Sequence, residues 1–288
     1  AVPFHFATPD AYSVAPSGVT ALMIVASQAG LYGMFRILFS VYGGVFTSAT
    51  VGWIVIILGV LSMFIGVTMA IPQKDIKRLL SYHAVSQTGY MLLGVGVALA
   101  VLGDVTLTNA FGQMAMEGGL FHIINHAMYK GLLFLAVGAV IYRTGVWNLN
   151  EMGGLGHKMK WTMIFFLIGA LAIAGIPPFN GFASKLMIYE STFAFNPAIA
   201  IIAMVVSILT LASFMKVFHS VFMGPELPEY AGVREVPKRM LAGMAILAVF
   251  VIIFGIVPDL VVDTLITPAA DALLHQWQYI LSVLGGGL

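Results

Sequence analysis

The chain contains several uninterrupted apolar stretches of about 20 residues, and this feature limits what it can fold into. Clear examples are 51–71, 197–223 and 240–258. A helix of about 20 apolar residues crosses the hydrocarbon core of a bilayer, which is about 30 Å thick. The stretches are continuous rather than alternating, which argues against spanning strands, since a bilayer accepts only helices or closed barrels. The sequence therefore predicts an all-α, multi-pass bundle of transmembrane helices.

Composition supports this class and excludes several functions. Hydrophobic residues make up 60% of the chain and charged residues only 9%, whereas soluble domains carry about 25% charged residues. The net charge of +1 gives no reason to expect a nucleic-acid partner. There is no cysteine, so the chain cannot form disulfides or hold an iron–sulfur cluster through thiolates. Any redox chemistry is therefore expected on partner subunits.

We predict seven spans within 17–258, and one of them is broken. They are 17–42, 51–71, 79–103, 110–142, 161–190, 197–223 and 240–258. Pro177 and Pro178 interrupt the fifth span, because proline has no backbone donor. Irregular backbone at membrane depth usually lines a cavity. Residues 259–288 are predicted to form an amphipathic tail that lies on the outer face or docks on a partner.

The loops predict how the bundle is oriented. Nine Lys and Arg residues fall in three loops, 72–78, 143–160 and 224–239. The loops between them hold no Lys or Arg, namely 43–50, 104–109 and 191–196. By the positive-inside rule the basic loops are cytoplasmic. We therefore expect a multi-pass protein of the inner (plasma) membrane.

One predicted span carries three titratable side chains on a single face. His122, His126 and Lys130 are spaced i, i+4, i+8, which makes a row about 12 Å long. Histidine titrates near neutral pH, and a charge at the centre of a membrane helix costs roughly 2.5–3.5 kcal/mol. The row therefore predicts a proton path. The alternatives are histidines that only bond neighbouring helices, or a zinc site, for which no third ligand and no Glu after the first His are present.

Three further residues are candidates for the ends of this path. Lys185 follows the broken stretch, where it can meet cavity water, although snorkelling to a membrane face is an alternative. His83 could be an entrance group, or a histidine satisfied within the helix packing. Glu117 could be an exit group, or an interfacial charge. We predict no catalytic, metal-binding or cofactor-binding residue in the chain.

Several motifs resemble those of one protein family. They are PFH at 3–5, PDA at 9–11, DIKRLLSY at 75–82, SQTGY at 86–90, HIINHAMYKGLLFL at 122–135 and GIPPFNGFASK at 175–185. In this order they resemble the antiporter-like large subunits shared by respiratory complex I, Mrp-type sodium/proton antiporters and membrane-bound hydrogenases. The resemblance extends over about residues 1–223.

The resemblance implies a fold of fourteen core helices in two inverted five-helix repeats. The chain is similar to the second repeat, and 1–16 is similar to the end of the first broken helix and its loop. The first repeat, with its Glu and Lys, is expected to lie outside this sequence. By resemblance Lys130 is the central lysine of the second half-channel, Lys185 is the terminal lysine that exchanges protons with the outside, and His122 and His126 connect them.

One departure from the family concerns the link between the half-channels. Several members carry a lysine where this chain has Gln28, and some have a histidine in place of Ile24. The second half-channel keeps its own residues. The lateral connection through the helix at 17–42 is therefore expected to be weaker.

Three hypotheses about function follow. The first is a non-catalytic, ion-pumping subunit of a redox-driven oxidoreductase complex of the membrane-bound hydrogenase or complex I type. It would pair with other membrane subunits and with a cytoplasmic redox module that holds iron–sulfur clusters or a nickel–iron site. The second is a subunit of a multisubunit Na⁺/H⁺ antiporter without a redox partner. The third, an inert scaffold, conflicts with the buried charges. We expect the first, and the subunits that co-purify with the chain distinguish it from the second.

Overall fold

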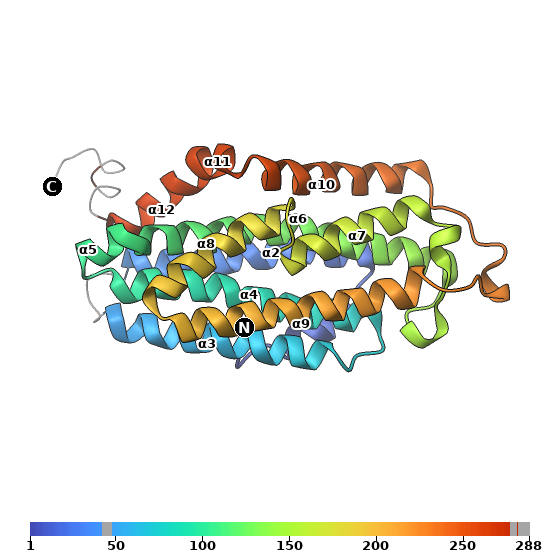
Figure 1. Ribbon diagram of the computed structural model, residues 1–288, viewed down its shortest axis with the longest axis horizontal. Coiled ribbons are helices and arrows are strands. Elements are labelled where there is room, and N and C mark those ends of the chain that lie inside the picture. The colour runs from blue at the N-terminus through green and yellow to red at the C-terminus, as the bar shows by residue number, and fades with distance from the viewer. Residues whose placement is uncertain (42–47, 277–280, 282–288) are drawn as a thin grey trace.

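A computed structural model describes residues 1–41, 48–276 and 281, and shows a bundle of long helices. Within these residues every regular element is helical. The principal helices are α2 (Ser17–Arg36), α3 (Ser48–Ala70), α4 (Ile76–Val101), α6 (Gln113–Thr144), α7 (Lys160–Ala174), α8 (Asn180–Phe195), α9 (Pro197–Phe222) and α10 (Lys238–Ile256). They run side by side along the long axis of the molecule (Figure 1). The fold is all-α, as the sequence predicts.

The long apolar helices lie close to six of the seven predicted spans. In the described residues, six helices are long and apolar enough to cross a membrane: Ser17–Ser40, Ala49–Ala70, Ile76–Val101, Val105–Thr144, Pro197–Phe222 and Lys238–Ile256. The remaining predicted span, 161–190, is divided between α7 and α8. The predicted loop 43–50 lies mostly outside the described residues.

Helix α4 and the continuous helical segment Val105–Thr144 both begin earlier than their apolar residues suggest, because an aspartate caps each one. Asp75 accepts a hydrogen bond from the backbone nitrogen of Arg78 at 2.9 Å, and α4 starts at Ile76 rather than 79. Asp104 accepts from the nitrogens of Thr106 and Leu107 at 2.9 and 3.1 Å. A short helix, α5 (Val105–Leu107), and a π-helical turn (Thr108–Gly112) therefore precede α6.

The predicted break in the fifth span is confirmed. Helix α7 ends at Ala174, Gly175 adopts a left-handed conformation with φ of 78°, and α8 begins at Asn180. The two halves also meet closely. A Cβ atom added to Gly181 would lie 1.9 Å from the carbonyl oxygen of Ala172, so only glycine fits this contact. The break therefore leaves backbone groups exposed to the interior of the bundle.

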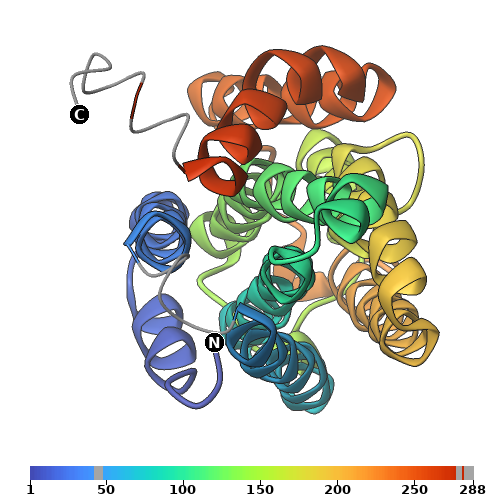
Figure 2. The same cartoon turned by 90° about the vertical axis from the view of Figure 1, so that its left-hand side faces the viewer.

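Helices α4 and α6 lie at the centre of the bundle. The end-on view shows α3, α2, α10, α8 and α9 arranged around them (Figure 2). Helix α4 is almost entirely buried, whereas α2 and α10 keep broad apolar faces exposed. Glycines bring α3 and α4 together, and a Cβ atom at Gly66 would lie 2.5 Å from the backbone nitrogen of Ser86. Polar side chains on α4 and α6 are therefore enclosed by other helices.

The three basic loops gather at one end of the bundle, which we call the basic end. Figure 1 shows the connections α3–α4, α6–α7 and α9–α10 at this end, and α5 and α12 (Thr267–Leu274) at the other. The basic loops and the described loops without Lys or Arg thus lie at opposite ends of the bundle, as their alternation along the sequence predicts.

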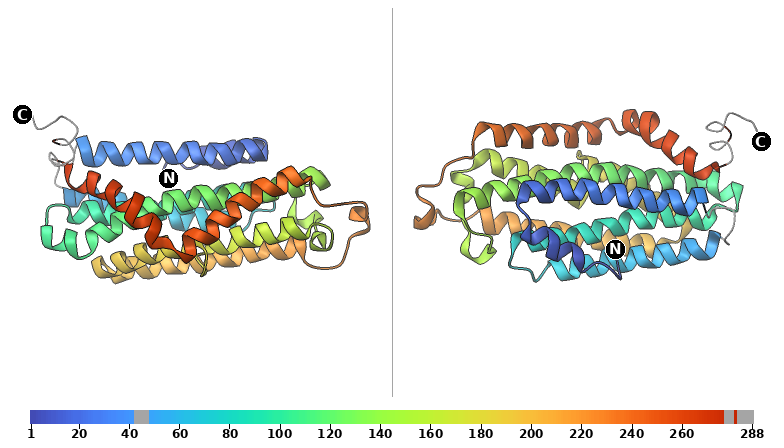
Figure 3. Two further views of the ribbon diagram at one scale, coloured as in Figure 1. Left: turned by 90° about the horizontal axis from the view of Figure 1, so that it is seen from above. Right: turned by 180° about the vertical axis from the view of Figure 1, so that it is seen from behind.

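The tail docks on the chain itself. After α10 the chain continues through α11 (Pro258–Val261) and a π-helical turn (Val262–Ile266) into α12, which crosses toward α6 (Figure 3). Its buried residues lie on one face: Val261, Ile266, Ala270, Leu273 and Leu274. The hydroxyl of Thr267 donates to the Glu117 carboxylate of α6 at 2.9 Å. Beyond residue 276 only Leu281 belongs to the described part of the predicted tail.

Candidate functional site

A stripe of polar side chains follows the inner face of α6. It consists of His122, Asn125, His126, Tyr129 and Lys130, each at most 1% exposed. The stripe faces α4 on one side and α8 on the other, because its partners lie on those two helices. Three of the predicted path residues therefore lie in the interior of the bundle.

His122 is the best-connected member of the stripe. Its Nδ1 lies 2.9 Å from the hydroxyl of Ser184 on α8, and its Nε2 lies 3.2 Å from the Gln87 side-chain oxygen on α4. The Gln87 oxygen can only accept, so this contact favours a proton on Nε2. Nδ1 is then free to accept from the Ser184 hydroxyl, which can also act as an acceptor. The surroundings of His122 therefore suit both its neutral and its charged form.

Tyr129 connects the two histidines. Its hydroxyl donates to the Gln87 oxygen at 3.3 Å and lies 3.2 Å from Nε2 of His122. Its ring meets the ring of His126 edge-on, with 5.6 Å between the centroids. Neither nitrogen of His126 has a hydrogen-bond partner in the described part of the chain. Tyr129 is thus the protein group through which the two histidines are in contact.

His126 borders a cavity of about 480 Å³. The cavity is mostly apolar, and its other polar lining comes from Thr8, Tyr12, Ser27, Gln28 and Thr88. A space of this size and polarity accepts water where polar groups lack partners. Gln28 faces the same cavity, so the position at which some family members carry a lysine lies beside His126.

Lys130 is buried without a carboxylate partner. Its ammonium donates to the carbonyl oxygen of Leu80 at 2.5 Å and lies 5.8 and 5.7 Å from the ring centroids of Phe134 and Phe214. The ion pairs found among the described residues, Arg78–Asp10, Lys158–Glu226 and His275–Asp271, do not include it. The charge is therefore stabilised by a backbone carbonyl and two aromatic rings.

Lys185 lies against the break between α7 and α8. Its ammonium donates to the carbonyl oxygen of Ile173 at 2.8 Å and to the hydroxyl of Ser207 at 2.9 Å. It also lies 4.4 Å from the centroid of the Tyr90 ring. The side chain is buried, so this geometry disagrees with the alternative of snorkelling to a membrane face.

The four predicted path residues are thus brought together only in part. His122 and His126 both contact Tyr129, whereas in the described residues no hydrogen bond joins Lys130 to His126 or Lys185 to His122. Sequence reasoning missed the bridging residues Gln87, Tyr129 and Ser184. Signals were present, because Gln87 and Ser184 lie in the quoted motifs and Tyr129 precedes Lys130. The role of these residues in transport remains a prediction.

The two predicted end groups differ in their surroundings. His83 is fully buried, and its Nε2 lies 2.8 Å from the Ser213 hydroxyl. Its ring lies 4.8 Å from that of Phe214, which also contacts Lys130. Glu117 is half-buried beneath the tail, where it accepts from Thr267 and from Gln113. His83 is thus next to the row, whereas Glu117 joins α6 to the tail.

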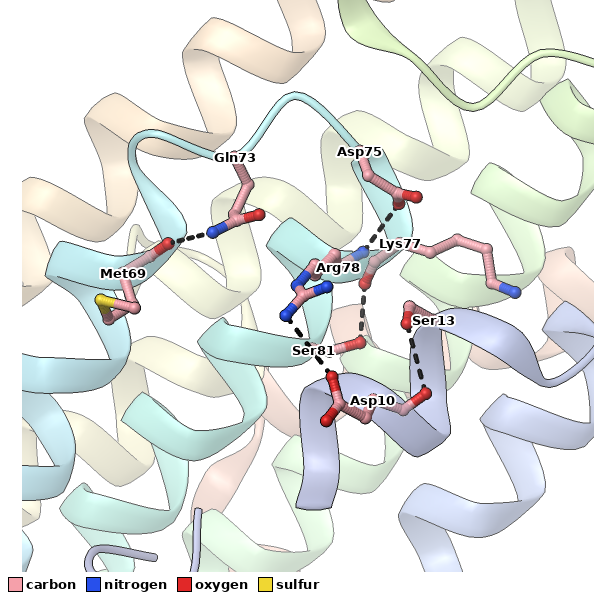
Figure 4. Close-up of polar contacts among 8 residues, drawn as sticks. All are labelled: Asp10, Ser13, Met69, Gln73, Asp75, Lys77, Arg78 and Ser81. Carbon is pink, nitrogen blue, oxygen red and sulfur yellow. Dashed lines mark hydrogen bonds and ion pairs between the residues drawn. The ribbon is translucent and has the colours of Figure 1, made fainter. Parts of the chain in front are cut away.

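The DIKR motif at 75–78 ties α1 (Ala7–Val14) to α4. Arg78 forms an ion pair with Asp10 at 3.4 Å (Figure 4), and the ammonium of Lys77 donates to the carbonyl oxygen of Ala15 at 2.5 Å. Lys77 thereby satisfies a carbonyl at the C-terminal end of α1. The motif has a structural role at the basic end and contributes nothing to the row itself.

The comparisons with known proteins agree with this geometry. Residues 1–210 match the family described as "NADH:quinone oxidoreductase/Mrp antiporter, TM". The chain belongs to this family. Among the described residues of this family member, no group of three His, Cys, Asp or Glu could hold a metal ion.

Relatives of this antiporter-family chain occur in more than one kind of complex. It is 37% identical to one Na⁺/H⁺ antiporter subunit of Alkalihalophilus pseudofirmus, over 94% of this chain and 35% of that protein. It is 35% identical to hydrogenase-4 component B of Escherichia coli, over 88% of this chain and 40% of that protein. A chain of the Mrp complex from Dietzia sp. superposes with a TM-score of 0.87 at 28% identity, over 98% of this chain and 58% of that one. The chain thus spans between about a third and three fifths of these relatives.

Proposed function

We propose that the chain forms a proton half-channel in a multisubunit membrane complex, with the row from Lys130 to Lys185 as its path. The observation that carries the proposal is the buried hydrogen-bonded unit formed by His122, Ser184, Gln87 and Tyr129. Inert membrane helices gain nothing from titratable groups held inside the bundle. Buried titratable groups do have a function where each can accept a proton from one neighbour and donate it to the next.

The proton steps follow from what each group can accept and donate. The Ser184 hydroxyl delivers a proton to Nδ1 of His122 and is itself re-protonated from the side of Lys185, its neighbour in the chain. His122 releases a different proton from Nε2 to the Tyr129 hydroxyl, which gives up its own hydroxyl proton to water on the side of His126. Water in the cavity beside His126 then pairs with its ring nitrogens and carries the proton on toward Lys130.

The lysines hold charge at the two ends of the row. Each ammonium is bound to a backbone carbonyl rather than to a carboxylate, so no fixed negative charge traps it. A change in the electrostatic field from a neighbouring subunit can therefore shift a proton between lysine and histidine. We propose that such a change drives the ion movement.

We propose a redox-driven complex, of the membrane-bound hydrogenase or complex I type, as the assembly that contains this chain. In it, iron–sulfur clusters or a nickel–iron site on partner subunits and a cytoplasmic redox module would supply the change in field. The similarity to hydrogenase-4 component B supports this choice.

The second candidate is a multisubunit Na⁺/H⁺ antiporter in the inner (plasma) membrane. The overlap with a chain of the Mrp complex along nearly the whole sequence favours it. Identification of the co-purifying subunits decides between the two.

The test of the half-channel is proton transport by the assembled complex in sealed vesicles. Lys130→Ala should abolish proton movement while the complex still assembles. The matched control is Lys216→Ala, because Lys216 donates to the carbonyl oxygens of Ile71 and Gln73 at the basic end rather than to a group of the row. Normal transport by the Lys130→Ala complex would show that the row is not the path.

A further inference from the structure

The break in the fifth span leaves two carbonyl groups without their usual helical partners. In a continuous helix the carbonyls of Ile173 and Ala174 would accept from the nitrogens four residues later, which are those of Pro177 and Pro178. Proline has no N–H, so both carbonyls lose these donors. They are the last carbonyls of α7, the end at which the helix dipole is negative.

Both carbonyls accept a hydrogen bond from a side chain: that of Ile173 from the Lys185 ammonium, and that of Ala174 from the Ser207 hydroxyl. The ammonium of Lys185 donates to the oxygen of Ile173 at 2.8 Å and to the Ser207 hydroxyl at 2.9 Å. That hydroxyl in turn donates to the oxygen of Ala174 at 2.9 Å. The ammonium is therefore bound by one backbone oxygen and one hydroxyl oxygen, and the second freed carbonyl is bound by that same hydroxyl. None of the ion pairs found among the described residues gives Lys185 a carboxylate partner.

The space around the ammonium depends on a glycine and is closed by an aromatic ring. A Cβ atom at Gly175 would lie 2.9 Å from Cδ of Lys185 and 3.8 Å from its nitrogen, so a side chain there would enter the site. The ring of Tyr90 covers the ammonium at 4.4 Å from its centroid. Carbonyl and hydroxyl oxygens together with an aromatic face are groups that also bind alkali cations.

We propose that the C-terminal end of α7 is a binding site for a monovalent alkali cation, which exchanges with the ammonium of Lys185 for the oxygens of Ile173, Ala174 and Ser207. Half-helix C-termini and freed carbonyls serve this purpose in other broken membrane helices. When Lys185 gives up its proton, the neutral amine withdraws and one Na⁺ takes its place. One proton leaves and one cation enters, so the charge of the site is unchanged. This inference shares one requirement with the proposed function, namely that Lys185 gives up and regains a proton.

The exchange makes a prediction about pH. Because one proton and one Na⁺ compete, the apparent dissociation constant for Na⁺ should rise about tenfold for each unit by which the pH falls while Lys185 is mostly charged. The other titratable side chains that interact with the ammonium in the described residues are Tyr90 and His83 on α4, Tyr189 on α8 and His122 on α6. Variants must therefore establish that Lys185 is the competitor.

The experiment is equilibrium binding of ²²Na⁺ to the purified complex, at several pH values. Lys185→Met removes the ammonium but keeps a side chain of similar shape, so this variant should bind Na⁺ with an affinity that no longer depends on pH. Ser207→Ala removes one of the oxygens and should weaken binding about tenfold or more. Ser191→Ala is the control, because the Ser191 hydroxyl only bonds to carbonyls of its own helix.

The outcomes separate this inference from the proposed function. It is overturned if Lys185→Met and the wild type bind the same amount of Na⁺ with the same dependence on pH. It is also overturned if Ser207→Ala leaves Na⁺ affinity unchanged in an assembled complex. If either result occurs while Lys130→Ala stops proton transport, the half-channel stands without a cation site. If Na⁺ competes as described while Lys130→Ala transports protons normally, the site stands without the half-channel.

Discussion

Gln87 provides the sharpest perturbation of the row, because a single oxygen serves two buried donors. It accepts from Nε2 of His122 at 3.2 Å and from the Tyr129 hydroxyl at 3.3 Å. Gln87→Leu keeps most of the side-chain volume and removes this acceptor. A hydrogen bond to a charged group contributes about 1.5–3 kcal/mol. If the Gln87 oxygen stabilises charged His122 by this amount, its loss makes that state about 10- to 150-fold less populated.

Proton flux through the row should fall by a similar factor, because every proton passes through charged His122. The assay is proton uptake by vesicles that contain the complex, with a pH-sensitive dye, normalised to the amount of assembled complex. Gln73→Leu is the matched control, because the Gln73 amide donates only to the carbonyl of Met69 at the basic end (Figure 4). Wild-type flux in an assembled Gln87→Leu complex would refute the reasoning.

Two further predictions concern the row and the break. His126→Ala should slow proton transfer less than Lys130→Ala does, because water in the enlarged cavity can replace the ring; a flux equal to that of the wild type would return His126 to a packing role. Gly181→Ala should lower the melting temperature of the complex, because the Cβ atom of the new alanine would lie 1.9 Å from the Ala172 oxygen. Gly30→Ala is the control, because a Cβ atom at Gly30 has no neighbour within 4 Å. Equal melting temperatures of the two variants would contradict this packing.

Local patterns in the sequence predicted much of the fold. The apolar stretches located the spans, and Pro177 and Pro178 located the break, because both effects act within a few residues of the chain. The starts of α4 and of the helical segment that begins with α5 at Val105 were missed by several residues. Asp75 and Asp104 cap those helices through backbone contacts that hydropathy does not record.

The site was less predictable because its partners are distant in sequence. Spacing alone placed His122, His126 and Lys130 on one face of a helix. The contacts of His122 with Gln87 and Ser184 join residues 35 and 62 positions away, and they depend on how α4 and α8 pack against α6. One contact was within reach, since the two prolines indicate which carbonyls of α7 need a new donor.

Whether His122 gains and loses a proton during turnover can be measured by infrared difference spectroscopy on the working complex with isotope-labelled histidine. The proposed path predicts imidazole protonation bands in the wild type that weaken or disappear when His122 is replaced by Gln. Bands that are identical in the wild type and the His122→Gln complex would contradict proton transfer through this row.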